Sequence, residues 1–329
     1  MTTTAIRPAR SARHHQIVGL SAAFGIGMLV AVQSRLNGEL GQVLADGVAA
    51  ALISFGTGLL ILLIGTALVP PIRRSLGNVW RAIRTPMRGH GGLRWWQCIG
   101  GVAGAFVVAT QSITVSVIGV AVFTVAVVAG QAVSSLVVDR LGFGPAGPQP
   151  YTTLRVVGAV LALAAVVLAV SSQLSHPDGL LLAVLPALGG IGTAVQQAIN
   201  GRVARTASRD AYGAIAAGVV NFLAGFAALL IVFLADLTLR GAPQHLPSEP
   251  WLYFGGACGV IFISAAAAVV RVVGVFVLGL GTIAGQLIAS LFIDLFVPAA
   301  DKAVTFPVVA GTVLALIAVV VAAVPNLRR

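Results

Sequence analysis

Charged residues are scarce in this sequence: Asp, Glu, Lys and Arg together make up 9% of its 329 residues. A soluble domain carries about 25%. Hydrophobic residues make up 58%, and the mean hydropathy is +1.01. A globule of this size cannot hide so much apolar surface from water, so its solvent must be lipid. The apolar stretches run on without polar alternation, which argues against a transmembrane β-barrel and predicts an all-α polytopic membrane protein.

Residues that usually carry out catalysis are missing from the apolar stretches. No Asp, Glu or Lys lies in the middle of a stretch, and all five histidines lie in tails or loops: His14, His15, His90, His176 and His245. The sequence has no Cys-x-x-Cys pair, no paired-histidine metal motif and no phosphate-binding Gly-Lys-Ser/Thr loop. We therefore predict no enzyme activity, no catalytic residue, no metal site and no cofactor.

Cysteine is also rare. Cys98 and Cys258 are the two in the chain, and each lies early in an apolar stretch, at faces of the membrane that we expect to be opposite. We therefore expect no disulfide and interpret both as small apolar filler.

The chain contains ten apolar runs, each near the length of about 20 residues that crosses a bilayer. They are residues 17–34, 47–69, 96–114, 116–138, 153–172, 180–200, 211–235, 251–270, 272–294 and 304–324. The third and fourth runs nearly touch, as do the eighth and ninth, so a tight turn or a broken helix is expected in each pair. Residues 1–16 are predicted to be a basic cytoplasmic tail. They imitate a signal peptide, but the match between runs one and six favours a retained first helix.

Basic residues indicate the orientation of these runs. With the amino terminus inside, all but three of the 20 Lys and Arg residues fall in inner segments, and the exceptions are Arg35, Arg240 and Lys302. This bias follows the positive-inside rule and places both termini in the cytoplasm. The same rule explains the net charge of +11, so we expect membrane lipid and no nucleic acid as a partner.

The second half of the chain repeats the first. Residues 96–139 align without a gap on residues 251–294 and share Trp, Gly, Gln, Ser and Asp positions. Five spans per half is an odd number, so residues 17–173 and 174–329 enter the membrane from opposite sides. We predict ten transmembrane helices as two inverted-topology five-helix repeats, an arrangement common in secondary transporters. Glycines four apart in the aligned segments are interpreted as sites of close helix packing.

One polar string occurs once in each half, at residues 33–38 and 196–201. Each string places a Gln and an Asn four residues apart on one helical face. Inversion then predicts an outer cluster of Gln33, Asn37 and Gln286 and an inner cluster of Gln196, Asn200 and Gln131. We interpret them as substrate-binding or gating residues, together with Gln197, that close alternately around a central cavity. The alternative is that the amides only join helices, at about 0.6 kcal/mol each.

Four further residues are candidates near these clusters. Gln111 and Arg271 are possible contributors, although Arg271 is also explained as an inner-loop topology charge. Asp139 and Asp294 end their helices near opposite faces and are candidates for ion coupling. Facilitated transport without coupling remains an alternative, because no carboxylate lies in mid-membrane.

With its Gln-x-x-x-Asn-Gly strings and the Ala-Gly-Gln strings at residues 129–131 and 284–286, the chain resembles the drug/metabolite transporter superfamily. Within it, the chain is most similar to the YdcZ-like family of bacterial inner-membrane proteins. The resemblance implies export of a small metabolite or drug, and a peripheral last helix in each half that faces lipid or a second copy in a homodimer. The competing interpretations are a membrane scaffold or lipid-handling protein without transport, and a passive channel.

Overall fold

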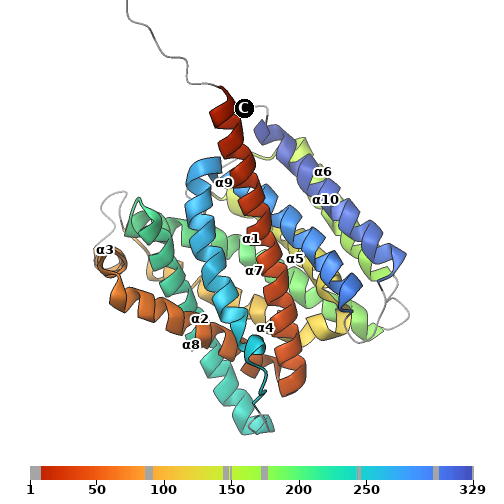
Figure 1. Ribbon diagram of the computed structural model, residues 1–329, viewed down its shortest axis with the longest axis horizontal. Coiled ribbons are helices and arrows are strands. Elements are labelled where there is room, and N and C mark those ends of the chain that lie inside the picture. Colours follow the sequence, from red (N-terminus) through yellow and green to blue (C-terminus); the bar gives the residue numbers. More distant parts are fainter. Residues whose placement is uncertain are drawn as a thin grey trace, which may run out of the picture.

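The structure is a computed structural model that describes residues 9–85, 92–143, 148, 150–171, 177–241, 243, 246–298 and 304–327. Several helical residues are described by their backbone alone. The α-helices are α1 (Ala9–Leu44), α2 (Gly47–Leu68), α3 (Pro70–Arg84), α4 (Gly101–Ile118), α5 (Val120–Arg140), α6 (Thr153–Val170), α7 (Pro177–Ala207), α8 (Ala211–Arg240), α9 (Gly255–Phe296) and α10 (Phe306–Leu327) (Figure 1). Two short 3-10 helices, η1 (Trp95–Cys98) and η3 (Pro250–Phe254), lead into α4 and α9.

The ends of these helices follow from local chemistry. The Asp46 carboxylate accepts hydrogen bonds from the Val48 and Ala49 amides, both at 2.9 Å, and so caps the start of α2. Val69 takes an extended conformation before Pro70, which ends α2 because a residue before proline avoids the helical region. Gly119 separates α4 from α5 with a φ of +84°, a value that glycine adopts without strain.

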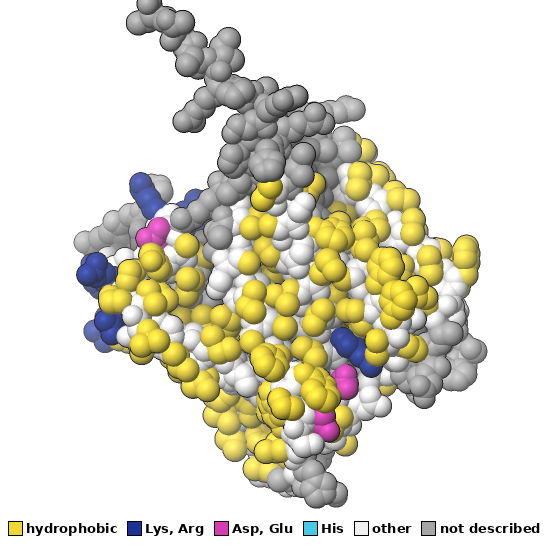
Figure 2. All heavy atoms as spheres, in the orientation of Figure 1, with side chains coloured by type: hydrophobic (Ala, Val, Ile, Leu, Met, Phe, Trp, Pro, Cys, Tyr) yellow, Lys and Arg dark blue, Asp and Glu magenta, His cyan; other side chains and the backbone are white. Residues whose placement is uncertain are grey.

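Seven helices in the described residues are long and apolar enough to cross a membrane, and the helical residues 250–266, 281–296 and 306–322 are shorter apolar segments. Hydrophobic side chains cover most of the face that Figure 2 shows. These observations confirm an all-helical, apolar fold. The first helix is longer than the predicted run 17–34, because the polar residues after it continue the helix to Leu44.

The predicted spans 251–270 and 272–294 form a single helical element, α9, of 42 residues. Its contacts with α1 nevertheless run in two directions. Residues 255–259 lie against α1 residues 37 back to 33, whereas residues 281–285 lie against α1 residues 20 on to 24. The chain therefore reverses along α1, and Figure 1 shows α9 as two arms.

The same relationship recurs with the halves exchanged. Residues 100–104 of α4 run antiparallel to residues 196–200 of α7. Residues 130–134 of α5 run parallel to residues 187–191 of α7. Each half thus lays one long helix along a helical pair of the other half. The core joins the halves as well, since Ala31, Phe123 and Ala289 belong to one buried cluster.

Helix α3 was not among the predicted elements. The residues after the second span were interpreted as a segment that reports topology, because a search for long apolar runs passes over a short amphipathic helix. The apolar residues Ile72 and Val79 lie on one buried face of α3. A helical period was therefore visible in the sequence.

Helices α6 and α10 lie side by side at one edge of the bundle (Figure 1). Their backbones approach closely at glycines: Gly158 of α6 faces Ala318 and Ala322, and Gly311 of α10 faces Ala165. Small residues permit this spacing, as they do between helices in lipid. The last helix of each half is thus at the periphery of the structure.

Candidate functional site

The repeated Gln and Asn of α1 lie on the glycine face of α9. A Cβ at Gly255 would collide with the Asn37 Oδ1 atom, and one at Gly259 would lie 3.2 Å from the Gln33 Nε2 atom. At both glycines, an amide side chain therefore occupies the space that a Cβ would fill. The glycines four apart, interpreted from the sequence as packing sites, hold the duplicated amides.

The second half repeats this contact against the first. Gly104 of α4 faces the Gln196 amide nitrogen, and a Cβ at Gly100 would lie 3.3 Å from the Asn200 Oδ1 atom. The amide pair of each half therefore sits on the glycine pair of the other half. Two equivalent polar contacts result, one at each end of the helix bundle.

At the end formed by α1, α4 and α9, a chain of hydrogen bonds joins three buried side chains, which we call the outer amide chain: Ser34, Asn37 and Gln111. Asn37 donates to the Gln111 Oε1 atom at 2.7 Å, and the Gln111 amide donates to the Ser34 Oγ atom at 2.9 Å. Asn37 and Ser34 are fully buried, and Gln111 is 4% exposed. The Asn37 Oδ1 atom has no hydrogen-bond partner among the described residues. This end is packed shut around a polar centre.

At the other end, both repeated amides form hydrogen bonds with Asn221 of α8. Its Oδ1 atom accepts hydrogen bonds from Gln196 at 2.8 Å and from Asn200 at 3.0 Å. Gln131 of α5 donates to the Gln197 Oε1 atom at 3.2 Å in a solvent-exposed position. The expected trio at this end is thus divided, because Gln131 meets Gln197 and not the other two. This inner amide group, defined by these five residues, contains the exposed Gln197 and the half-buried Asn200, whereas Asn37, the repeat counterpart of Asn200, is fully buried. Gln33 and Gln196 are both half-buried.

Asp294 adds a further contact between the halves at the end that carries the outer amide chain. Its carboxylate accepts hydrogen bonds from the backbone amides of Val120 at 2.9 Å and Ala121 at 2.7 Å. These amides are the free donors at the start of α5, so Asp294 of the second half caps a helix of the first half. A Cβ at Gly119 would lie 2.6 Å from the carboxylate, which explains glycine at this bend.

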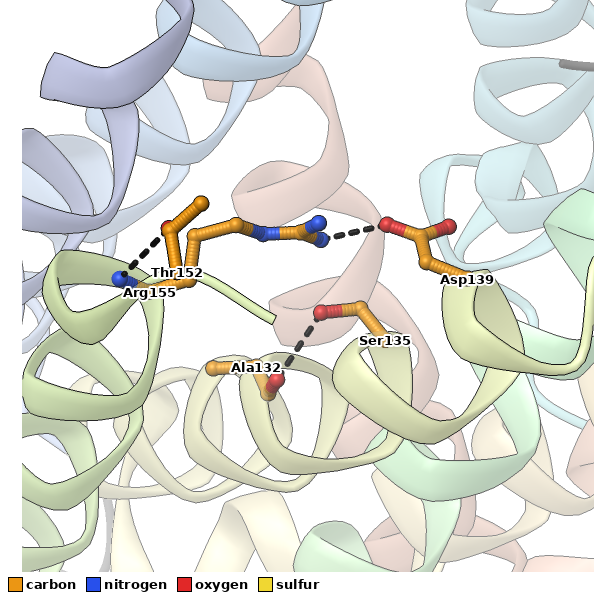
Figure 3. A network of polar contacts seen from close by, with 5 residues as sticks. All are labelled: Ala132, Ser135, Asp139, Thr152 and Arg155. Atoms are coloured by element: carbon orange, nitrogen blue, oxygen red, sulfur yellow. Dashed lines mark hydrogen bonds and ion pairs between the residues drawn. The ribbon is translucent and has the colours of Figure 1, made fainter. Parts of the chain in front are cut away.

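Asp139, which aligns with Asp294 in the repeat, has a different partner. It forms an ion pair with Arg155 at the start of α6, and Figure 3 shows the guanidinium pointing at the carboxylate. Both side chains are partly exposed. The two repeat-related carboxylates are thus used differently: one caps a helix of the other half, and the other pairs within its own half.

Three other predicted residues or sites have these positions. Gln286 lies on the second arm of α9, where its backbone faces Gly27 of α1, short of Gln33 along that helix. The Arg271 side chain lies outside the described residues. No group of His, Cys, Asp or Glu in the described part of the chain is arranged to hold a metal, and Cys98 and Cys258 are free thiols.

Sequence reasoning missed Ser34 and Asn221 as members of the polar centres. Ser34 lies inside the first repeated string, and Asn221 aligns with Ser54 between the repeats. That alignment was a usable signal, because Asn is costly in an apolar helix unless it finds a partner.

Comparison with known proteins places this fold. The family model described as "Putative inner membrane exporter, YdcZ" matches residues 18–168 and again residues 181–321. No curated protein matches the chain. Five chains of solved structures are similar; one, described only as "Crystal structure of protein", is 16% identical over 96% of this chain and 98% of that one, with a TM-score of 0.53. This likeness shows a shared fold. Because the family model matches most of its length, the chain belongs to the YdcZ family of drug/metabolite transporters, described as inner membrane exporters.

Proposed function

We propose that the chain exports a small metabolite or drug by alternating access, through a passage between two inverted repeats of five helices. The ten crossings are those predicted from the sequence, with α9 counted as two because its contacts with α1 reverse. The two matched regions of the family model support a duplicated chain. Repeats that enter the membrane from opposite sides favour rocking of two bundles around a shared site.

The orientation we propose has both termini in the cytoplasm. The bias of basic residues supports it. The first turns of α1 and the last turns of α10 lie at the same end of the bundle (Figure 1), as an even number of crossings requires. The end that carries the outer amide chain then faces the outside.

The observation that carries the proposal is the unequal state of the two related ends. The outer amide chain is buried, and Asp294 caps α5 beside it. The inner amide group is partly accessible, and Asp139 does not cap a helix. Alternating access predicts such a difference, because one end of a symmetric pair must be closed while the other is open. We therefore interpret the structure as a state closed to the outside.

In the opposite state, we propose that the capping role passes from Asp294 to Asp139. Gly274 of α9 aligns with Gly119, so the backbone amides that follow it are the counterparts of those that Asp294 caps. Asp139 would leave Arg155 and cap α9 there, while Asp294 would release α5. Proton or ion coupling through either carboxylate fits this transfer, and so does transport without coupling.

The duplicated amides are proposed to bind substrate and to seal the two ends. Gln33, Asn37, Gln111 and Gln286 serve the outer end, and Gln131, Gln196, Gln197 and Asn200 serve the inner end. Arg271 is kept as a candidate at the inner end. Neutral amides bind polar groups of many kinds without fixing a charge, which suits a small polar or amphipathic substrate.

Transport is tested in proteoliposomes with radiolabelled amino acids, radiolabelled nucleobases and fluorescent cationic dyes, each with and without a pH gradient. We expect saturable flux of at least one probe above protein-free liposomes, and loss of it in a Gln33→Leu/Gln196→Leu variant that still folds. The matched control is Gln42→Leu, outside both polar centres. Flux that rises linearly with concentration would indicate a channel, and no flux of any probe would contradict the proposal.

Topology is tested separately with single cysteines in a chain whose Cys98 and Cys258 are replaced by Ala. In intact cells we expect a membrane-impermeant maleimide to label cysteine at Glu249 and not at Thr85. Labelling of both from the outside would overturn the ten-crossing arrangement even if transport is observed.

A further inference from the structure

The surface of α3 has no role in the proposed transport. This helix has 15 residues, four of which are arginine, and it contains no Asp or Glu. It follows α2 directly and turns away from it at Pro70, and Figure 1 shows α3 almost end-on while α2 runs across the view. In the aligned part of the second half, the described residues after α8 contain no helix of this kind. Helix α3 is therefore an addition to the repeat.

One face of α3 is anchored to the body of the protein. Ile72, Val79 and Ala82 are buried, and the last two belong to a core cluster with Val203 of α7. Asn78 also donates a hydrogen bond to the carbonyl of Ala207 at 2.8 Å. This anchoring fixes which residues of α3 point outward.

The outward face carries the four arginines and one tryptophan. Arg73, Arg74, Arg81 and Arg84 are exposed, and Trp80 is 55% exposed. The Arg84 guanidinium stacks 4.2 Å above the Trp80 ring, so charge and aromatic surface lie together. Figure 2 shows basic side chains gathered at the edge where Figure 1 places α3.

Neighbouring elements add little opposing charge. Helices α7 and α8 both pack against α3. Arg205 lies in the last turn of α7, and the residues between the two helices include Arg209 and one carboxylate, Asp210. The carboxylate accepts a hydrogen bond from the Tyr212 amide at 3.0 Å, where it caps α8. The charge at this end of the bundle is therefore strongly positive.

We propose that α3 lies in the interface of the inner leaflet and binds the headgroups of anionic phospholipids. Four arginines facing one way complement a negative lipid surface. Trp80 suits the boundary between headgroups and acyl chains, where an amphipathic ring has one apolar and one wet side. The proposal depends on the membrane embedding of the chain and on the orientation proposed above, and not on its transport activity.

The test uses tryptophan fluorescence in reconstituted vesicles. In a Trp95→Phe/Trp96→Phe/Trp251→Phe variant, Trp80 is the reporter. The vesicles contain phosphatidylcholine and one quencher, either brominated phosphatidylglycerol or brominated phosphatidylcholine. The mole fraction of quencher is the same in the two preparations. We expect roughly twofold or stronger quenching by the anionic quencher, reduced at high salt. The preference should disappear when the four arginines are changed to Gln, which leaves the buried face intact.

The matched control keeps Trp251 and changes Trp80, Trp95 and Trp96 to Phe. Trp251 is 54% exposed at the other end of the bundle, beside Glu249, and we expect both lipids to quench it equally. Equal quenching of Trp80 by the two lipids, or a preference that survives the four Gln substitutions, would overturn the proposal. Quenching of Trp80 by neither lipid would place α3 outside the interface and overturn it as well.

Discussion

The Asp294 carboxylate lies 2.9 Å from the Val120 amide nitrogen, although 174 positions separate the two residues in the chain. A side chain near the end of α9, in one repeat, thus caps the first turn of a helix in the other. The bond to the Ala121 amide makes the contact bidentate. In the alternating access proposed above, a rocking motion of the two halves would break this contact.

Replacing Asp294 by Ala removes both hydrogen bonds and leaves two buried amides without an acceptor. We expect the free energy of unfolding in detergent to fall by about 1–3 kcal/mol. The control is Asp139→Ala, which breaks a partly exposed ion pair worth about 0–1 kcal/mol. Thermal and denaturant unfolding measure both. Equal losses in the two variants would show that the cap is not a stabilising contact.

The outer amide chain predicts a non-additive pair of substitutions. Gln111→Leu leaves the Asn37 side chain buried without any partner, so we expect a loss of about 1–3 kcal/mol. Adding Asn37→Leu removes the orphaned amide, and the double variant should be no less stable than Gln111→Leu. A double-mutant cycle on unfolding free energies measures this coupling. If the two losses simply add, the hydrogen bond does not contribute.

The glycine contacts predict that the stability cost of a Gly→Ala substitution depends on what surrounds the glycine. Gly255→Ala places a methyl group against Asn37, inside a packed helix contact, and should cost about 1–3 kcal/mol. Gly65→Ala meets nothing within 4 Å and should be neutral or stabilising by up to about 1 kcal/mol, because alanine favours the helix. Thermal unfolding of the two variants measures the contrast, and a similar effect at both sites would reject the contact.

Much of the fold could be predicted because a protein surrounded by lipid has a distinctive amino-acid composition. The scarcity of charge predicted lipid, and the duplicated strings predicted two related halves. The partners of the amides were less readable. Helices such as α4 are apolar on nearly every side, so periodicity does not say which way Gln111 turns. Its meeting with Asn37 is decided by packing between helices far apart in the chain.

In the candidate site, too, the sequence predicted the positions of residues but not their partners. The aligned positions of Asp139 and Asp294 were found from the repeat, but the repeat predicts equal roles for them. The structure assigns them different partners. The proposed alternating access accounts for this difference, because a single state of such a cycle is not symmetric. Arg155 has no basic counterpart in α10, so nothing in the repeat predicts its ion pair with Asp139.

The proposed transfer of the cap from Asp294 to Asp139 predicts that two conservative substitutions both favour the state that is open to the outside. Asp294→Asn weakens the closed outer end, whereas Arg155→Gln releases Asp139 and favours closure of the inner end. Reporter cysteines replace Ser112, which is 2% exposed near the outer end, and Gln197, which is exposed near the inner end. The background carries Cys98→Ala and Cys258→Ala, and the reagent is a membrane-impermeant maleimide.

We expect each substitution, Asp294→Asn and Arg155→Gln, to speed labelling at position 112 and to slow labelling at position 197. A bias of about 1 kcal/mol between the two states corresponds to roughly a fivefold change in their ratio. The control is Arg209→Gln, an exposed basic residue that forms neither carboxylate contact. If either substitution speeds labelling at both positions, the carboxylate affects overall stability and does not select between states. Opposite changes at the two reporters require a shift between two conformations, because a loss of stability would expose both positions together.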